Sequence, residues 1–312
     1  MDTERLIPFQ DFDLDSITLP DLSAEELRVT TEYVEITRHL QEISQLFSVF
    51  RYDLQSLLNV YDLNNKDELV RRKAYVDGFD DRTEINALVI SYLSAGKTLT
   101  DSLKTCVEKS CSTLEEDRVG YQELLTRVYD GAFSYRLLVR LRDYAQHGHL
   151  PVSIVDNRLC FDLGQIINTP HFNHNKSLKG EMETFIEELL VKHETQPRYV
   201  FTLAMAEYTA SMAEIYDGFW EKMERAFTFR AEAFQRLIGA RPDDLEHKRE
   251  NLKGFFFYLI ENTLHCFNAM DDSFALFRQC QKAARAFLES QQSELRSLRS
   301  SLRLVPMGEG AE

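Results

Sequence analysis

Residues that interrupt helices are scarce in this chain, and this scarcity limits the available folds more than any other feature. Glycine and proline contribute 12 and 7 of the 312 residues. Together they make up about 6% of the chain, roughly half of their usual share in globular proteins. Few tight turns can be encoded at this frequency, so we expect long helices with few connections.

Apolar residues recur at three- and four-residue spacing in three long stretches of the first half of the chain. Residues 23–62 begin at Ser23 with the pattern Ser-x-x-Glu, in which each side chain accepts a hydrogen bond from the other residue's backbone N–H. Residues 81–109 form the second stretch, which Asp81 can cap. Residues 112–147 form the third, and Ser112 begins another Ser-x-x-Glu. The spacing predicts three antiparallel helices.

The pattern changes after Pro151. Short alternating runs flank a polar turn in residues 152–162, which predicts a β-hairpin. Helical spacing returns in residues 176–194 and in a stretch that Pro197 opens and Gly239 ends. The residues after 241 are predicted to be helical, but periodicity leaves the apolar run at 255–260 open between helix and strand. The predicted fold class is all-α, a long-helix bundle with a small β-hairpin insertion.

Composition divides the chain into three parts. Residues 1–22 are acidic and contain two prolines, which predicts an extended arm. Residues 23–240 are predicted to form a helical domain with the hairpin near 152–162, and residues 241–312 a C-terminal helical extension. The extension has six basic residues between 278 and 303, which form either a solvated helix face or a surface that contacts phosphates or another copy.

Residues 198–239 are unusually rich in aromatic side chains. Aromatic rings can stack on nucleic-acid bases. Their helical spacing favours packing in the protein core instead. The aromatic residues are Tyr199, Phe201, Tyr208, Tyr216, Phe219, Trp220, Phe227, Phe229 and Phe234.

Several functional classes lack support in the sequence. No apolar run reaches the roughly eighteen residues that span a bilayer, so we expect a cytoplasmic protein without a membrane partner. The five cysteines show no Cys-x2-Cys pairing, which argues against disulfides and zinc. No P-loop, Rossmann glycine pattern, Gly-x-Ser-x-Gly or His-Glu-x-x-His occurs, and no cofactor is expected. Although His149, His171 and His174 are near in sequence, no carboxylate or cysteine pattern supports a metal site.

The net charge of −15 weighs against general binding to nucleic acids, because affinity for phosphates comes mainly from lysine and arginine. The charge is unevenly distributed. Residues 1–26 contain eight acidic residues and one arginine, whereas Arg136, Arg140 and Arg142 are unopposed within residues 136–142. A mostly acidic protein with one small cluster of arginines is better suited to a site that binds selectively than to general coating of RNA.

This cluster of arginines lies in residues 135–152, which are the strongest candidate for a functional site. Apolar residues recur at helical spacing up to Tyr144, Gly148 can adopt a left-handed cap conformation, and Pro151 blocks continuation. A helix is therefore predicted to end at His147. The carbonyl groups at a helix C-terminus favour an imidazolium, which makes His147 a candidate for proton transfer near neutral pH.

Arg142 and Asp143 precede His147 by five and four positions. Asp143 and His147 share one face of a helix, so the carboxylate can orient the imidazole. Arg142 and His147 lie about 140° apart on an ideal helix. They can reach one phosphate only if the last turn distorts or a second copy contributes.

The pattern Arg142-Asp143-x-x-x-His147, with its continuation to Pro151, resembles the HEPN family of small helical RNases. The resemblance implies cleavage of RNA without metal, with the 2′-hydroxyl as nucleophile. It assigns the cation beside the phosphorus to Arg142, proton transfer to His147 and a supporting role to Asp143. Substrate binding is expected from the neighbouring residues Arg136, Arg140, Tyr144, Gln146 and His149.

The resemblance also implies a homodimer in which two motifs face each other. An RNase of this type can act as a toxin or antiphage effector, with an antitoxin or defence protein as its partner. Two other functions stay open, a catalytically silent helical scaffold and a nucleotide-binding or regulatory partner of another protein.

Overall fold

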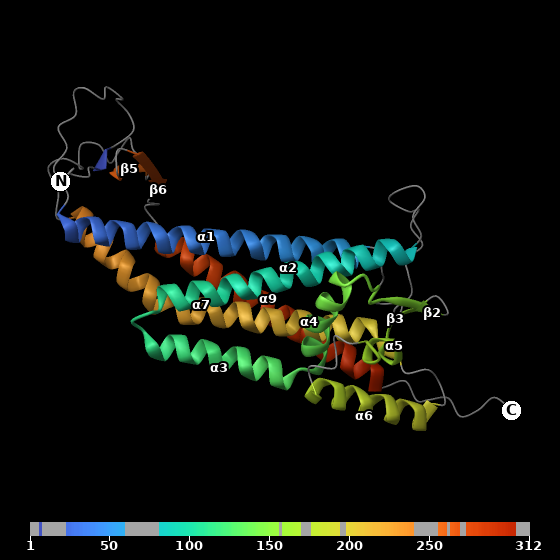
Figure 1. Cartoon of the computed structure of the whole chain (residues 1–312). Helices are drawn as coiled ribbons and strands as arrows, with labels where there is room; N and C mark the ends of the chain where they lie inside the picture. Colours follow the sequence, from blue (N-terminus) through green and yellow to red (C-terminus); the bar gives the residue numbers. More distant parts are fainter. Residues whose placement is uncertain are drawn as a thin grey trace.

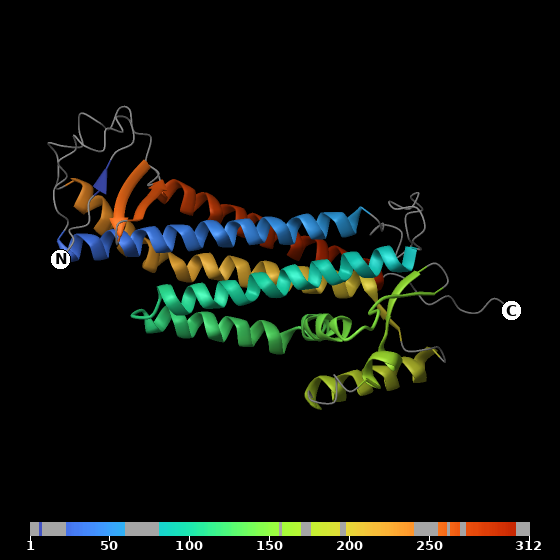
Figure 2. The same ribbon diagram turned by 45° about the horizontal axis from the view of Figure 1, so that its top comes forward.

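The computed structural model describes residues 6–7, 23–59, 81–155, 158–169, 176–193, 198–239, 255–260, 263–268 and 273–303. Long helices dominate the described chain, which confirms the predicted all-α class. The longest helices run side by side, and two small sheets lie near opposite ends of the bundle (Figure 1, Figure 2). The helices are α1 (Ala24–Leu58), α2 (Asp81–Ser110), α3 (Glu115–Gly131), α4 (Phe133–Gln146), α5 (Leu163–Ile167), α6 (Lys176–His193), α7 (Phe201–Gly239) and α9 (Ser273–Arg303).

The first two predicted helices are confirmed. Helix α1 begins with the predicted capping box, in which Ser23 Oγ accepts a hydrogen bond from the Glu26 N–H at 3.3 Å and Glu26 Oε2 accepts one from the Ser23 N–H at 2.7 Å. The helix ends at Leu58, and residues 60–62 lie outside the described part. Helix α2 has nearly the predicted bounds.

The prediction of one helix over residues 112–147 is wrong. The chain forms two helices, because Ala132 between them is extended, with φ −125° and ψ 103°. The second capping box is also wrong, since α3 has Leu114 at its N-cap and no side-chain cap. At the break, the Arg136 guanidinium donates to the carbonyl oxygens of Tyr129, at 3.0 Å, and Asp130. These bonds satisfy carbonyls that end α3 and would otherwise lack partners.

The predicted hairpin is confirmed as β2 (Ser153–Val155) and β3 (Arg158–Asp162), which pair antiparallel with Ser153 opposite Cys160. A third strand, β4 (Arg198–Val200), pairs with β3. The prediction that a helix starts at Pro197 is therefore wrong, because α7 starts only at Phe201. Pro197 itself lies outside the described residues.

The open question about residues 255–268 is answered by two strands. Strands β5 (Phe255–Ile260) and β6 (Thr263–Asn268) form an antiparallel pair. Strand β1 (Leu6–Ile7) from the predicted arm pairs with β5 and completes the sheet. The open choice between helix and strand is therefore settled as strand, and the predicted helix follows in α9.

Helix α7 is the centre of the bundle and packs against α1, α2, α3, α4 and α9. Its aromatic residues form the core as predicted, except that Phe229 is 61% exposed. The rings of Tyr33 on α1 and Phe234 stack at 4.2 Å between centroids, and those of Phe227 and Phe277 on α9 at 4.5 Å. Helix α2 approaches α7 closely at Gly96, where a side chain would clash with the Tyr208 hydroxyl.

Ion pairs at the edge of the core fix α9 on α7. Arg285 pairs with Asp217 at 3.0 Å and Arg299 with Glu207 at 2.7 Å. Two of the six basic residues predicted for the C-terminal tail therefore contact α7. The division of the chain near residue 240 stays a prediction.

Two further observations concern the described residues. None of their helices combines the length and the apolar character needed to cross a membrane. Cys106, Cys111, Cys160 and Cys280 form no disulfide, and the first three are buried.

Candidate functional site at the end of α4

Helix α4 carries the motif, and its buried face fixes the direction of the motif residues. Its apolar side chains at Leu137, Leu138, Leu141 and Tyr144 are buried in the core. Because a helix has 3.6 residues per turn, the positions between them point toward the surface. These positions hold residues 140, 142, 143, 146 and 147, which include all three predicted catalytic residues.

The end of α4 has the predicted geometry. His147 is the C-cap, with φ −93° and ψ 17°, and its N–H donates to the Tyr144 carbonyl at 3.2 Å. Gly148 follows with φ +88°, a left-handed conformation that glycine adopts without steric cost. Its N–H donates to the Ala145 carbonyl at 3.1 Å. The chain therefore reverses directly after His147, which is exposed.

A residue that the sequence analysis missed holds the segment after this turn. Asn86 on α2 is 1% exposed, and its side chain forms two hydrogen bonds with the buried backbone of Val152. The Val152 N–H donates to Asn86 Oδ1 at 2.8 Å, and Asn86 Nδ2 donates to the Val152 carbonyl at 3.0 Å. The signal in the sequence was a polar residue beside Ile85 on the apolar face of a helix.

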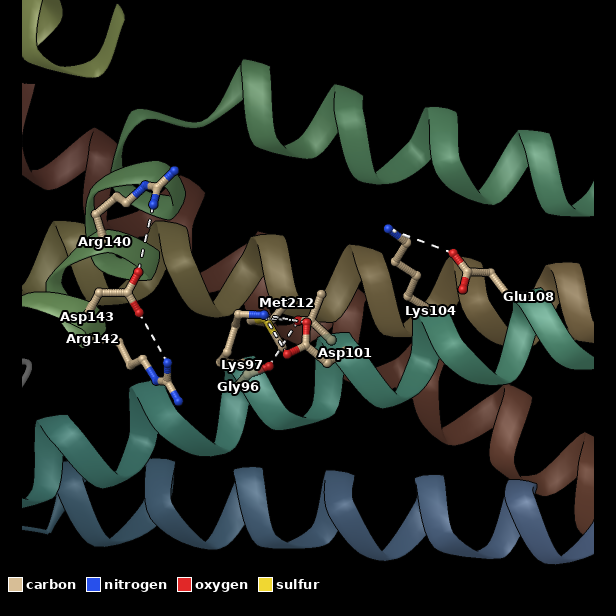
Figure 3. A network of polar contacts seen from close by, with 10 residues as sticks. Gly96, Lys97, Asp101, Lys104, Glu108, Arg140, Arg142, Asp143 and Met212 are labelled. Atoms are coloured by element: carbon tan, nitrogen blue, oxygen red, sulfur yellow. Dashed lines mark hydrogen bonds and ion pairs between the residues drawn. The ribbon is translucent and has the colours of Figure 1, made fainter. Parts of the chain in front are cut away.

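Three charged side chains form a cluster on the outer face of α4 (Figure 3). Asp143 Oδ1 accepts a hydrogen bond from Arg142 Nη1 at 3.1 Å, and Asp143 Oδ2 lies 3.8 Å from Arg140 Nη1. The Arg142 side chain is 26% exposed, and its Nε is buried without a partner among the described residues. One carboxylate thus lies between two guanidinium groups, so the cluster has a net charge of +1.

Arg136, a predicted substrate-binding residue, is mostly buried. Its side chain is 11% exposed and pairs with Glu181 on α6 in addition to the two carbonyls of α3. In this arrangement Arg136 joins α3, α4 and α6. Its predicted contact with a substrate stays a prediction.

The remaining predicted residues surround the end of the helix. Tyr144 is 5% exposed, and burial, followed by the charge of Asp162, raises the pKa of its phenol. The ring of His149 stacks on the Tyr144 ring with 4.5 Å between centroids and 21° between planes. Gln146 and His149 are exposed. The turn at Gly148 thus brings an exposed imidazole onto a buried phenol.

All the predicted residues except Arg136 lie in the last two turns of α4 or directly after them, where Tyr144 is buried and the others are at least partly exposed. Helix α4 stays α-helical through Gln146, so Arg142 and His147 are still separated by about 140° around the helix axis. Asp143 and His147 share a face, as predicted. Within the described residues, no group of three or more His, Cys, Asp or Glu side chains is arranged to hold a metal ion. His171 and His174 lie outside these residues.

Comparisons with known proteins return no match, whether with protein-family models, with curated proteins or with solved structures.

Proposed function

We propose that this chain is an RNA endonuclease of the HEPN type that needs no metal and acts at the end of α4. The observation that carries the proposal is an exposed histidine at a helix C-cap, one turn after a partly exposed Arg-Asp-Arg cluster. Histidine is the side chain that most often transfers protons in catalysis, and the cluster offers cations for a phosphate. The match to the HEPN motif at Arg142, Asp143 and His147 supports the same assignment.

The reaction that fits these groups is transfer of a phosphodiester to the adjacent 2′-oxygen. A bond forms between the 2′-oxygen and phosphorus, and the bond from phosphorus to the 5′-oxygen of the next nucleotide breaks. The 2′-hydroxyl loses a proton to a base, and the leaving 5′-oxygen gains one from an acid. The products are a 2′,3′-cyclic phosphate and a 5′-hydroxyl.

Arg142 can bind the phosphate without breaking its contact with Asp143. It uses Nη1 for the carboxylate, while Nη2 has no partner among the described residues. The guanidinium presents its donors as a planar fork, so Nη2 can donate to a phosphate oxygen at the same time. Charge that develops on the phosphorane oxygens is then stabilised by a fixed cation.

A homodimer forms part of the proposal. One imidazole cannot both accept the first proton and donate the second within a single displacement, and Arg142 and His147 diverge by about 140° on α4. A second copy that faces the first would supply the missing histidine. Light scattering should then give twice the chain mass, and specific activity should fall on dilution. Activity of a 36 kDa monomer that is independent of concentration would contradict the dimeric site.

The alternative is a helical scaffold without catalysis, and one observation favours it. Arg140, Asp143 and Arg142 already neutralise one another in part, as surface ion pairs do in many proteins without a ligand. Such a scaffold would tolerate substitution of all three residues and of His147.

The decisive experiment compares cleavage of a labelled single-stranded RNA by the wild type, His147→Ala and Arg142→Lys in the presence of chelator. We expect wild-type cleavage that leaves cyclic phosphate ends, and no cleavage of DNA with the same sequence, which lacks the 2′-hydroxyl. His147→Ala should abolish activity, and Arg142→Lys should lose most of it because an ammonium lacks the planar fork.

Two variants outside the site serve as matched controls. His39→Ala on α1 removes a histidine, and Arg118→Lys on α3 makes the same exchange at an exposed position. Both should cleave like the wild type. Equal activity in His147→Ala and the wild type, or activity that chelator removes, would contradict the proposal.

We further propose that a partner protein controls the activity in the cell, as an antitoxin or a defence component would, because an unrestrained RNase harms its host. Expression of the wild type in bacteria should slow growth and degrade RNA, and His147→Ala should do neither. Co-expression of a candidate partner should restore growth.

A further inference from the structure

A groove between α1, α7 and α9 has walls without charge. Its volume is about 280 Å³, and its lining comes from one face of α1 between Tyr33 and Gln45, from Trp220 and Phe227 on α7, and from the first two turns of α9. None of the described residues that line it is acidic, basic or a histidine, although 28% of the chain is charged. The hollow between α2 and α3, in contrast, is lined by three basic and two acidic side chains.

The buried part of the lining is aromatic. Tyr33, Trp220, Phe227 and Phe277 all line the groove, and each is at most 5% exposed. Phe227 and Phe277 stack with 4.5 Å between centroids and 4° between planes, and Trp220 meets Phe277 edge-on at 5.3 Å. Because these rings already hold one another in place, the groove is formed before a ligand arrives, and binding orders few side chains.

Tyr33 and Cys280 are the ionisable side chains of the lining, and both stay neutral near pH 7. Burial raises the pKa of the Tyr33 phenol and of the Cys280 thiol above their ordinary values. The other polar side chains are hydroxyls and amides, such as the exposed amides of Gln41 and Gln45. A charged ligand would therefore lose part of its hydration in the groove without gaining a counter-ion, and binding of an uncharged ligand is favoured.

The volume of the groove limits the size of such a ligand. A dry cavity of about 150 Å³ lined by apolar side chains holds one benzene ring. The groove has roughly twice that volume, which suits two fused rings. Aromatic ligands pack well against aromatic walls, because rings attract one another in stacked and edge-on arrangements.

We propose that the groove between α1, α7 and α9 is a binding site for an uncharged small molecule with two fused aromatic rings. The site lies on other elements than the end of α4, so it is independent of the proposed RNase activity. Trp220 lines the groove and is the only tryptophan of the chain, so its emission reports whether the groove is occupied.

The test compares two probes on the whole chain at neutral pH. Quinoline has two fused rings and is uncharged under these conditions, whereas N-methylquinolinium has the same rings and a permanent positive charge. Equilibrium dialysis should show saturable binding of quinoline, and N-methylquinolinium should bind about tenfold more weakly or not at all. Quinoline should change the emission of Trp220 with the same midpoint as the dialysis curve.

A pair of variants at Leu276 tests the location with the smallest change in shape. Leu276→Glu places a carboxylate in the lining, in the first turn of α9, where an acidic residue favours the helix. It should weaken quinoline binding about tenfold or more. Leu276→Gln has nearly the same shape without the charge and should retain most of the affinity. Val119→Glu makes the same kind of change at a 42% exposed position on α3 and should bind like the wild type.

Several results would overturn the proposal. They are an absence of saturable quinoline binding to the folded wild type, equal binding of the two probes, and binding that leaves the emission of Trp220 unchanged. Equal affinities of Leu276→Glu and Leu276→Gln would also overturn it, with thermal unfolding used to verify that both variants are folded. RNA cleavage by Leu276→Glu should equal that of the wild type, so the two proposals can fail separately.

Discussion

Replacing Asn86 by alanine should both destabilise the protein and release the turn that carries the candidate site. Asn86 is 1% exposed and Val152 is fully buried, so the Val152 N–H and carbonyl have no access to water. Alanine would leave both groups without their hydrogen bonds of 2.8 and 3.0 Å. A buried polar group without its partner costs about 1–3 kcal/mol, and two such groups with partial relaxation give an expected loss of about 2–4 kcal/mol.

The assay is thermal and urea unfolding of the wild type, Asn86→Ala and Asn86→Asp. A loss of this size corresponds to a fall in Tm of roughly 3–6 °C for a chain of this length. At pH values where its carboxyl is protonated, the aspartate keeps an acceptor for the Val152 N–H and has one O–H that can donate to the carbonyl, so its stability should lie between the other two. The ionised carboxylate lacks this donor, so the stability of Asn86→Asp should fall as the pH rises. Hydrogen exchange at the Val152 amide should accelerate in Asn86→Ala.

The refuting result is an unfolding free energy of Asn86→Ala within about 0.5 kcal/mol of the wild type, the range typical of surface substitutions. It would mean that the turn after α4 is held by other contacts. RNA binding should weaken in Asn86→Ala if Asn86 positions His149, even under conditions in which the protein is fully folded.

Three further predictions concern the bundle. Gly96→Ala should lower the unfolding free energy by about 1–3 kcal/mol, measured in urea, because the new methyl would clash with the Tyr208 hydroxyl. Burial raises the pKa of Asp217, so the folded state keeps the Asp217 proton at pH values just above the ordinary aspartate pKa, where the unfolded chain has lost it. The unfolding free energy should therefore fall as the pH rises through this window, and the fall should be smaller in Asp217→Asn, which has no titrating carboxyl there. Arg136→Ala should lower stability by about 1–3 kcal/mol, because Glu181 and two carbonyls of α3 lose their donor; loss of RNA binding without loss of stability would contradict this structural role.

The helical part of the fold was predictable because its signals are local. The capping box at Ser23 and the apolar spacing after it determine α1 within a few residues, and Gly148 with Pro151 marks the end of α4. These patterns act through the backbone of the same segment. The positions of the motif residues relative to one another followed from the predicted helix alone.

The break at Ala132 was missed because alanine favours helix most and the single Gly131 before it is tolerated within a helix at a cost of only about 1 kcal/mol. The break coincides with contacts to other elements, through Arg136 to α6 and through Ser134, which is hydrogen-bonded to Glu207 on α7. Strand β4 escaped detection for a related reason. Three residues are too few to show alternation, and its partner β3 is distant in sequence.

The partners of the candidate site were similarly hidden. Asn86 and Val152 are 66 residues apart. No sequence pattern around either residue indicates that the two are in contact. The sequence places Asp143 next to Arg142, but the contact to Arg140 depends on side-chain conformation. Periodicity identifies which side chains point outward and leaves open which of them pair.

The length of α7 has a consequence for how this molecule would appear in solution. Its 39 residues span roughly 58 Å along the bundle, and the hairpin β2–β3 that follows the α4 site lies near the end opposite to the sheet formed by β1, β5 and β6 (Figure 2). Two copies that meet through the ends that carry β2 and β3 would form a rod with nearly twice the maximum dimension of one copy. Two copies that associate along the sides of α1 or α9 would keep that dimension almost unchanged and double the cross-section. X-ray scattering at small angles distinguishes these shapes without any knowledge of the substrate.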